Sequence, residues 1–340
     1  MQINKLLGYA LIALSYAGGW VWMDYDGAKN NAAVWEKPVT VEIEKGDTLK
    51  KITEKLQAQN VYFKPFWFNF LAKQDGINKK IKSGEYELPV EATVPQILNL
   101  FVSGKVKQHH MTFPEGWSFK QIRQELDQNP YLQHTLQNAT LEQIPAQLGI
   151  SQNHPEGLFF PDTYFFEKNT TDAALLKRAY DRMQIVLAEE WQNRAENLPL
   201  TTPYQALILA SIIEKETGAP AERAQIAGVF TRRLQQDMML QTDPTVIYGM
   251  GERYQGDIKT EDLHTPTPYN TYTFKGLPPT PIAMAGREAI HAALHPDSSE
   301  AIYFVAKGDG SHVFSKTLEE HNAAVDLYQR HKNEAENEQR

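Results

Sequence analysis

The sequence of 340 residues contains no cysteine, which excludes thiol nucleophiles, disulfide bonds and cysteine-ligated zinc. Basic residues are in the minority, since 34 Lys and Arg stand against 42 Asp and Glu. The resulting net charge of -8 does not suit a nucleic-acid partner, which would require a basic surface. Walker loops, G-x-S-x-G elbows and G-x-G-x-x-G dinucleotide fingerprints are also missing. We therefore predict no nucleic-acid partner and no cofactor.

The first feature that is present is an apolar segment near the N-terminus. Leu6 to Met23 carries no formal charge, and Lys5 precedes it. As a helix this segment is long enough to cross a bilayer, and the positive-inside rule would export everything after it. A cleaved signal peptide with its cleavage site at residues 15–17 is the alternative. We favour an uncleaved anchor because the apolar run continues to Trp22.

The remaining chain divides by composition and periodicity into an α+β protein with several parts. The predicted parts are an anchor over residues 1–23, a polar linker over 24–38, a small α/β subdomain over 39–104, a larger mixed α+β domain over 105–330 and a polar tail over 331–340. The length is sufficient for domains of this size to bury their own cores.

An internal similarity connects the small subdomain with the larger domain. The segment Gly46–Leu56 matches Gly116–Leu126, with hydroxyl residues Thr48 and Ser118 at equivalent positions. Each copy predicts a strand, a glycine turn, a hydroxyl cap and an amphipathic helix. Convergence on a common strand-cap-helix pattern is the alternative to a true repeat.

Three helices are predicted in the larger domain, and one long segment has little periodicity. The helices are expected over residues 171–191, 203–216 and 220–236. The segment from Leu240 to Pro281 is rich in Gly, Pro and aromatic residues instead. Such a stretch within a compact domain is usually functional or misread.

The helix over 203–216 carries the most specific chemical signal. Its residues 206–213 are apolar nearly all round, which predicts a buried helix, and Glu214 and Glu216 lie at its end. Partial burial and the negative end of the helix dipole would both raise the pKa of Glu214. A carboxylic acid that stays protonated near neutral pH can act as a general acid in glycosidic cleavage. Ordinary ion pairs with Lys215, Arg223 or Arg232 are the competing interpretation.

A second group of polar and aromatic residues, in segments 240–245 and 267–279, suggests sugar binding. Amides, hydroxyls and aromatic rings of this kind bind the polar edges and apolar faces of sugars, although a packed Ω-like loop would have the same composition. Another turn, around Glu156, also places carboxylates between aromatic residues. The candidate substrate-binding residues are Gln241, Thr242, Asp243, Tyr269, Asn270, Tyr272, Glu156 and Glu216.

Histidines give only a weak metal signal. His291 and His295 are spaced i,i+4, as zinc ligands on one helix face can be. The glutamate of the zincin pattern is missing, because residue 292 is Ala. We therefore predict no catalytic metal.

Four separated motifs resemble those of the endolytic murein transglycosylases of the MltG/YceG-like family. The matching segments are Leu209–Thr217, Leu240–Gly249, Tyr269–Tyr272 with Gly276–Pro279, and Glu156–Thr163. They occur in the family's order, and the resemblance runs from the anchor to about residue 330. It implies a single-pass protein of the inner membrane, a LysM-like subdomain over residues 39–104 and a periplasmic catalytic domain.

The resemblance also implies a reaction. Glu214 would be the catalytic acid and base that cleaves the β-1,4 bond between N-acetylmuramic acid and N-acetylglucosamine in nascent peptidoglycan strands. The product would be a 1,6-anhydro sugar, and the reaction would end strand growth near peptidoglycan synthases (penicillin-binding proteins). The alternatives are a non-catalytic LysM-type peptidoglycan-binding scaffold and a muramidase that adds water.

Overall fold

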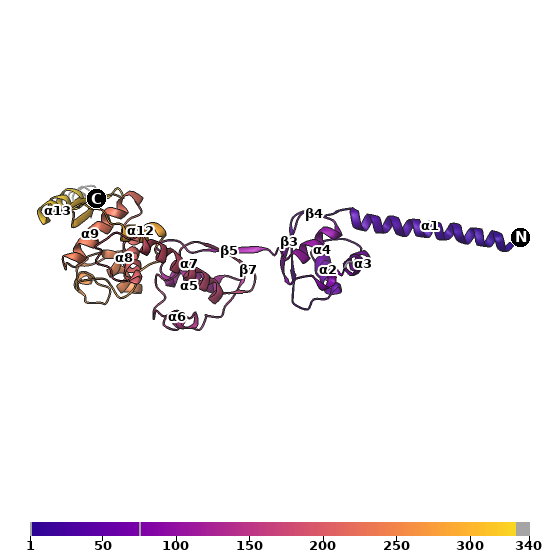
Figure 1. Ribbon diagram of the computed structural model, residues 1–340, viewed down its shortest axis with the longest axis horizontal. Helices are drawn as coiled ribbons and strands as arrows, with labels where there is room; N and C mark the ends of the chain where they lie inside the picture. Colours follow the sequence, from indigo (N-terminus) through magenta and orange to yellow (C-terminus); the bar gives the residue numbers. More distant parts are fainter. Residues whose placement is uncertain (1, 75, 331–340) are drawn as a thin grey trace. The chain divides into compact units, whose positions relative to one another are not determined.

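The computed structural model describes residues 2–74 and 76–330, so the predicted polar tail lies outside the described residues. The protein is a mixed α+β structure with an N-terminal apolar helix, as the sequence predicts. Its contacts divide it into a smaller unit of Met1–His109 with Phe165–Asn169 and a larger unit of His110–Tyr164 with Thr170–Arg340. Figure 1 shows the elements of each unit, coloured along the chain. Each unit is described by itself.

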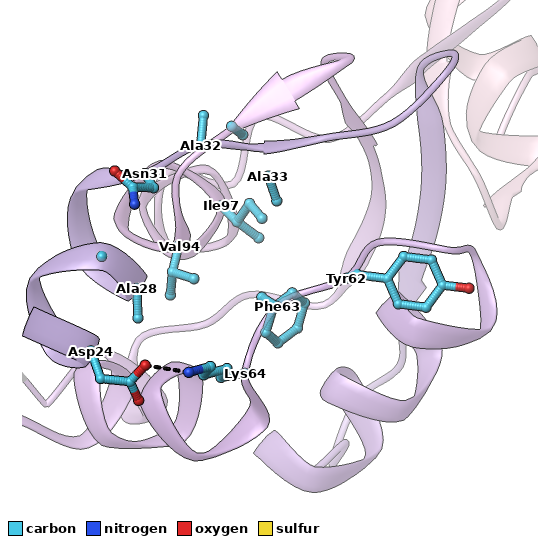
Figure 2. Close-up of a pocket in the computed structure, with 12 residues that line it drawn as sticks. Asp24, Ala28, Asn31, Ala32, Ala33, Tyr62, Phe63, Lys64, Val94 and Ile97 are labelled. Atoms are coloured by element: carbon cyan, nitrogen blue, oxygen red, sulfur yellow. Dashed lines mark hydrogen bonds and ion pairs between the residues drawn. The ribbon is translucent and has the colours of Figure 1, made fainter. Parts of the chain in front are cut away.

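Helix α1 (Gln2–Asn30) begins the smaller unit and is longer than the sequence suggests. It has the length and apolar composition to cross a membrane, and its side chains between residues 9 and 23 are exposed. The sequence predicts a polar linker from residue 24, and the structure differs in that residues 24–30 continue the helix. The reason is tertiary packing: Asp24 pairs with Lys64 and accepts a hydrogen bond from Trp67 Nε1 at 2.8 Å. Figure 2 shows this end of α1 beside the segment around Phe63.

The rest of the smaller unit is a compact arrangement of short helices and strands. Strands β2 and β3 pair antiparallel, with Val41 opposite Tyr86, and their inward side chains cover one core. Helices α2 and α4 bury one face each, as their apolar spacing predicts. The elements after α1 are β1 (Ala33–Val34), β2 (Val39–Ile43), α2 (Leu49–Ala58), α3 (Pro65–Gln74), the 3₁₀ turn η1 (Ile77–Lys79), β3 (Gly84–Leu88), β4 (Glu91–Ala92) and α4 (Val94–Ser103).

The two similar segments of the sequence adopt the same local structure. Thr48 caps α2 and Ser118 caps α5 (Phe119–Gln128), each accepting a hydrogen bond from the backbone N–H three residues later. Gly46 and Gly116 both have positive φ, +93° and +73°, in the preceding turns. A left-handed turn before a hydroxyl cap explains why both glycines are needed. The predicted strand-turn-cap-helix pattern is confirmed in both copies.

The larger unit consists mainly of helices connected by loops and short strands. Within the described residues every strand belongs to a two-stranded sheet, and β5 pairs with β7, β6 with β8, and β9 with β10. The elements are β5 (Gln108–Thr112), α5, β6 (Leu132–Gln133), α6 (Gln143–Gln147), β7 (Thr163–Glu167), β8 (Thr170–Thr171), α7 (Asp172–Gln192), α8 (Pro203–Glu216), η2 (Pro220–Glu222), α9 (Arg223–Gln235), α10 (Asp243–Met250), η3 (Gly251–Arg253), α11 (Thr260–His264), α12 (Arg287–Leu294), β9 (Tyr303–Ala306), β10 (His312–Ser315), α13 (Leu318–Val325) and the π-helical turn η4 (Asp326–Arg330).

Helix α8 is the centre of the larger unit. Every residue from Ala206 to Ile213 is buried, which confirms the prediction from its apolar sequence. Helices α7, α9, α10 and α12 pack around it. Figure 1 labels α7, α9 and α12 near α8. The third predicted helix begins later than expected, because Pro220–Glu222 forms a 3₁₀ turn before α9.

The segment from Leu240 to Pro281 was partly misread from its weak periodicity. It contains α10, η3 and α11, all short, and the loops between them pack by side-chain hydrogen bonds. Helices of five to eight residues make at most about two turns, which is too short for the spacing of apolar residues to reveal a helical period.

Candidate active site

Glu214 lies in the last turn of α8, where the buried helix reaches the edge of the core. Thr202 caps the start of this helix and Pro203 occupies its first position. The helix stops after Glu216, and the extended Thr217 follows, before Gly218. Ser211 ties the helix to a neighbouring loop, because its Oγ accepts a hydrogen bond from Ile282 N at 3.0 Å. The same loop continues to Gly286, which contacts Glu214.

The carboxyl group of Glu214 is largely buried but keeps a small solvent exposure. Its side chain is 6% exposed, and its Oε2 accepts a hydrogen bond from the backbone N–H of Gly286 at 3.0 Å. Arg223 Nη2 lies 3.7 Å from its Oε1. The ion pair that the sequence offered as a competing interpretation is therefore present with Arg223, whereas Arg232 pairs with Asp297.

Opposing effects act on the pKa of Glu214, and the balance raises it. Burial raises the pKa most, the Gly286 hydrogen bond lowers it, and the nearby carboxylate of Glu115 raises it again. Arg223 and Lys215 lower it by smaller amounts. Burial and Glu115 thus favour the protonated acid, whereas Gly286 N–H, Arg223 and Lys215 favour the carboxylate, and an acid that later acts as a base needs support for both forms.

Glu115 is a neighbour of Glu214 that the sequence reasoning missed. Its carboxylate lies directly against the Cα of Gly286: a Cβ at position 286 would be 1.8 Å from Glu115 Oε1. Glycine is thus required at 286 for the close approach of this carboxylate. Two backbone hydrogen bonds connect loop 114–117 with loop 284–286. Gly116 N donates to Met284 O and Met284 N donates to Trp117 O, both at 2.8 Å. No short-range sequence signal could show this, because the two segments are distant in the chain.

Glu216 occupies a different environment two residues further along. Its Oε1 accepts a short hydrogen bond from Thr242 Oγ1, and the Asp243 carboxylate is close enough to act on it. Burial raises the pKa of Glu216 to about 7, against the opposing effect of the Thr242 bond. Asp243 in turn accepts a hydrogen bond from Tyr272 Oη at 2.6 Å. The structure therefore brings together four of the predicted site residues at the end of α8.

The loop that carries these residues is fixed by buried polar side chains. Asn270 is 1% exposed, and its amide donates to the carbonyl oxygens of Asp262, Leu263 and Thr265. Arg233 donates to the backbone of residues 239 and 240 and to Gln241 Oε1 at 3.2 Å. Asn270, Thr242 and Gln241 are thus engaged within the protein, and a direct contact of these three with substrate stays a prediction.

A cavity of about 580 Å³ lies beside Lys215 and Tyr269. Its wall includes Lys215, the residue after Glu214, and Tyr269, whose ring packs edge-on against Tyr248 at a centroid distance of 4.7 Å. Apolar and aromatic walls with a few polar groups are typical of ligand sites. The full lining is Gly116, Ser118, Phe119, Lys120, Gln121, Leu141, His154, Glu156, Lys215, Pro244, Ile247, Tyr248, Gly251, Glu252, Tyr269 and Ile282.

Glu156 is the buried carboxyl group of this cavity. Its side-chain oxygens accept hydrogen bonds from Phe119 N at 2.9 Å and Tyr248 Oη at 3.1 Å. Burial raises the pKa of Glu156 to about 7, although these bonds lower it. With 2% exposure it fixes α5 and the Tyr248 ring relative to each other, and it also contributes to the cavity wall.

Comparisons with known proteins show which family the chain resembles. The profile of the YceG-like family matches residues 41–327. An endolytic murein transglycosylase of Bacillus subtilis is 31% identical over 313 residues, covering 87% of this chain and 86% of the relative. One from Streptococcus pneumoniae is 28% identical over 350 residues and 92% of this chain, which spans 63% of that relative's length. The crystal structure of a yceG-like protein from Listeria monocytogenes is 32% identical, with a TM-score of 0.55 and coverage of 85% of this chain and 99% of that chain.

Proposed function

Because the chain belongs to the YceG-like family, we propose that it cleaves the glycan strands of peptidoglycan with Glu214 as both acid and base. The protein is an endolytic murein transglycosylase, an enzyme rather than a non-catalytic scaffold. The observation that carries the assignment of Glu214 is its position: a partly enclosed carboxyl group, raised in pKa and held by the Gly286 N–H.

The chemistry follows from one carboxyl group that acts twice. Glu214 protonates the oxygen that links N-acetylmuramic acid to N-acetylglucosamine, and the C1–O bond breaks. The Glu214 carboxylate then takes the proton from the C6 hydroxyl of the same muramyl residue as that hydroxyl attacks C1. A 1,6-anhydro ring forms, no water is consumed, and Glu214 ends protonated. An internal hydroxyl needs no second carboxylate to activate water, because proximity replaces the bimolecular step.

The surroundings of Glu214 suit both halves of this cycle. Burial and Glu115 favour the protonated acid before cleavage. Once the proton has left, Gly286 N–H and Arg223 stabilise the carboxylate.

We assign sugar binding to the surfaces on both sides of Glu214. The cavity with Tyr248, Tyr269 and Ile247 offers apolar faces for sugar rings, and Lys215 in its wall adjoins the acid in sequence. Asp243 and Tyr272 offer hydrogen-bonding groups on the other side. These surfaces are held in place by side chains that hydrogen-bond within the protein, namely Glu216, Thr242, Gln241 and Asn270.

The setting of the reaction is part of the same proposal. Helix α1 anchors the chain in the inner membrane by a single pass, and the larger unit acts in the periplasm on nascent strands, ending their growth beside peptidoglycan synthases. We further propose that residues 39–104 are a LysM-like subdomain. The strand-helix-helix-strand order of β2, α2, α3 and β3, with β2 and β3 antiparallel, supports this assignment.

Oxygen isotope labelling tests the reaction class directly. Uncross-linked glycan strands are digested in ¹⁸O-enriched water, and the new ends are analysed by mass spectrometry. We expect ends one water lighter than reducing ends and free of ¹⁸O. Reducing ends that carry one ¹⁸O atom would show hydrolysis and overturn the proposal, and the absence of new ends would show that the protein does not cleave these strands.

A further inference from the structure

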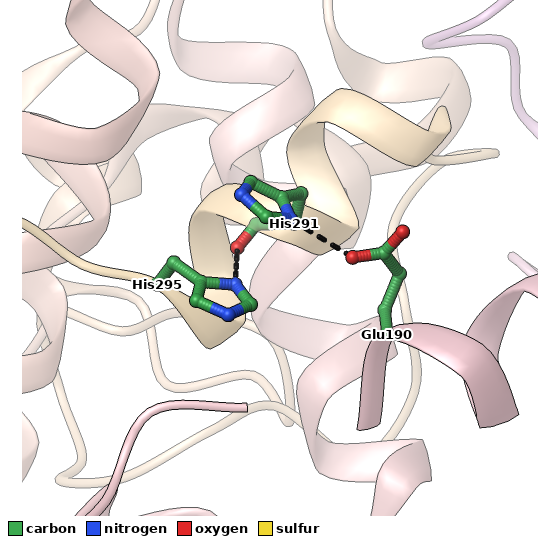
Figure 3. A group of neighbouring side chains, drawn as sticks. All are labelled: Glu190, His291 and His295. Atoms are coloured by element: carbon green, nitrogen blue, oxygen red, sulfur yellow. Dashed lines mark hydrogen bonds and ion pairs between the residues drawn. The ribbon is translucent and has the colours of Figure 1, made fainter. Parts of the chain in front are cut away.

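A glutamate and two histidines converge where α7 meets α12 (Figure 3). His291 lies in α12, His295 follows its last turn, and Glu190 comes from the last turns of α7. One ring nitrogen of each histidine and one carboxylate oxygen lie within 4.8 Å of one another. The sequence showed two histidines at i,i+4 without a third ligand, and the fold supplies that ligand from a residue about a hundred positions earlier.

We propose that Glu190, His291 and His295 bind a Zn²⁺ ion that fastens α7 to α12. Two imidazoles and one carboxylate are a ligand set that Zn²⁺ takes in tetrahedral geometry, with water in the fourth position. The His291 side chain is 56% exposed, so water can reach that position.

The distances are compatible with this geometry after small side-chain movements. His291 Nδ1 lies 2.8 Å from Glu190 Oε2, and the histidine rings stack with centroids 4.1 Å apart. Ligand atoms at about 2.1 Å from a tetrahedral ion lie about 3.4 Å apart. The ligand atoms now lie within 4.8 Å of one another, so binding requires movements of about an ångström, made mainly by the two histidines because Glu190 is buried.

The hydrogen bonds of His295 determine which of its ring nitrogens can bind the ion. Its Nε2 lies 2.8 Å from Asn193 O and its Nδ1 lies 3.1 Å from His291 O. A neutral imidazole carries one N–H and can donate to only one of these carbonyl oxygens. With Nε2–H donating to Asn193 O, Nδ1 is the nitrogen that can bind the ion, and the ring must turn so that the Nδ1 lone pair points away from His291 O. A backbone carbonyl that orients the other nitrogen is a usual support for a metal-ligating histidine.

The local charge also favours a cation. Glu190 is buried, and Arg287 Nη1 binds its Oε1 at 2.8 Å, which leaves Oε2 facing His291. Arg287 is shared with Glu189. With neutral histidines the two carboxylates and one guanidinium carry one net negative charge.

The position of the ion connects it to the acid without placing it in the reaction. Helix α12 begins directly after Gly286, whose N–H holds Glu214. Both α12 and α7 pack against α8. A zinc bridge between α7 and α12 would therefore stiffen the support of Glu214, and the ion itself stabilises the fold rather than contacting the glycan.

Zinc binding to the full-length, detergent-solubilised protein tests the proposal. After chelator treatment, calorimetric titration with ZnCl₂ should show one equivalent bound, and zinc should raise the Tm. His291→Gln and His295→Gln should each weaken binding at least tenfold and abolish the Tm increase. His264→Gln, at an exposed position of α11, is the matched control and should bind like the parent.

Two results would overturn the proposal. One is the absence of zinc binding by the parent protein. The other is unchanged binding by the double variant His291→Gln/His295→Gln with native circular dichroism, which would place the zinc elsewhere. Both readouts are independent of glycan cleavage, so the result does not depend on the proposed reaction.

Discussion

Replacing Glu214 with glutamine removes the acid while preserving much of its environment. The amide oxygen of Gln can still accept the hydrogen bond from Gly286 N–H, so the orientation of the side chain should persist. The electrostatic contact with Arg223 at 3.7 Å is lost, and its guanidinium remains largely buried, 12% exposed. We therefore expect a folded protein of reduced stability.

The expected loss of activity follows from the double role of the carboxyl group. General acid or base catalysis contributes about 10²–10⁴-fold, equivalent to about 3–5 kcal/mol in the barrier. Since Glu214 serves both proton transfers in the proposed cycle, the decrease should lie at the upper end of that range.

The assay compares kcat on uncross-linked glycan strands by counting 1,6-anhydro ends with mass spectrometry. Glu125→Gln, at an exposed position of α5, controls for the loss of one carboxylate charge and should cleave like the parent. Binding of strands by the Glu214→Gln variant should remain. Turnover within threefold of the parent by a folded Glu214→Gln protein would refute the role of Glu214 and transfer attention to Glu216.

Three further predictions follow from the same structure. Because Glu115 raises the pKa of Glu214, Glu115→Gln should lower that pKa, and the alkaline limb of the kcat/KM profile should move to lower pH; an unmoved limb would contradict the contact. Burial raises the pKa of Glu216 from 4.5 to about 7, so ionisation of Glu216 destabilises the folded state as pH rises through this interval. Measured by chemical denaturation, the free energy of unfolding of Glu216→Gln relative to the parent should increase by up to about 3 kcal/mol between pH 4.5 and pH 8. An equal difference at both pH values would count against burial of this carboxyl group. Gly157→Ala should destabilise by about 2–4 kcal/mol, measured as a lower Tm, because φ is +74° and a Cβ would lie 2.2 Å from Pro281 Cβ; an unchanged Tm would show that this loop is not tightly packed.

Local sequence signals were sufficient for features whose physics is local. The apolar composition of α1 and α8, the hydroxyl caps Thr48 and Ser118 and the burial of residues 206–213 follow from side chains close together in the chain. Glu214 was a candidate acid because a carboxylate at the end of an apolar helix is desolvated wherever that helix packs, and the family resemblance made it the predicted catalytic residue.

Tertiary structure decided the features that depend on distant segments. The continuation of α1 beyond residue 23 depends on Lys64 and Trp67, and the tuning of Glu214 depends on Glu115 and Gly286. The sequence predicts that the amide of Asn270 binds sugar, yet in the fold this amide donates to three backbone carbonyl oxygens. Likewise, two histidines acquire a carboxylate partner only when α7 lies against α12. Electrostatic and hydrogen-bond energies act through space over a few ångströms, so residues far apart in sequence set them, and no local pattern encodes that proximity.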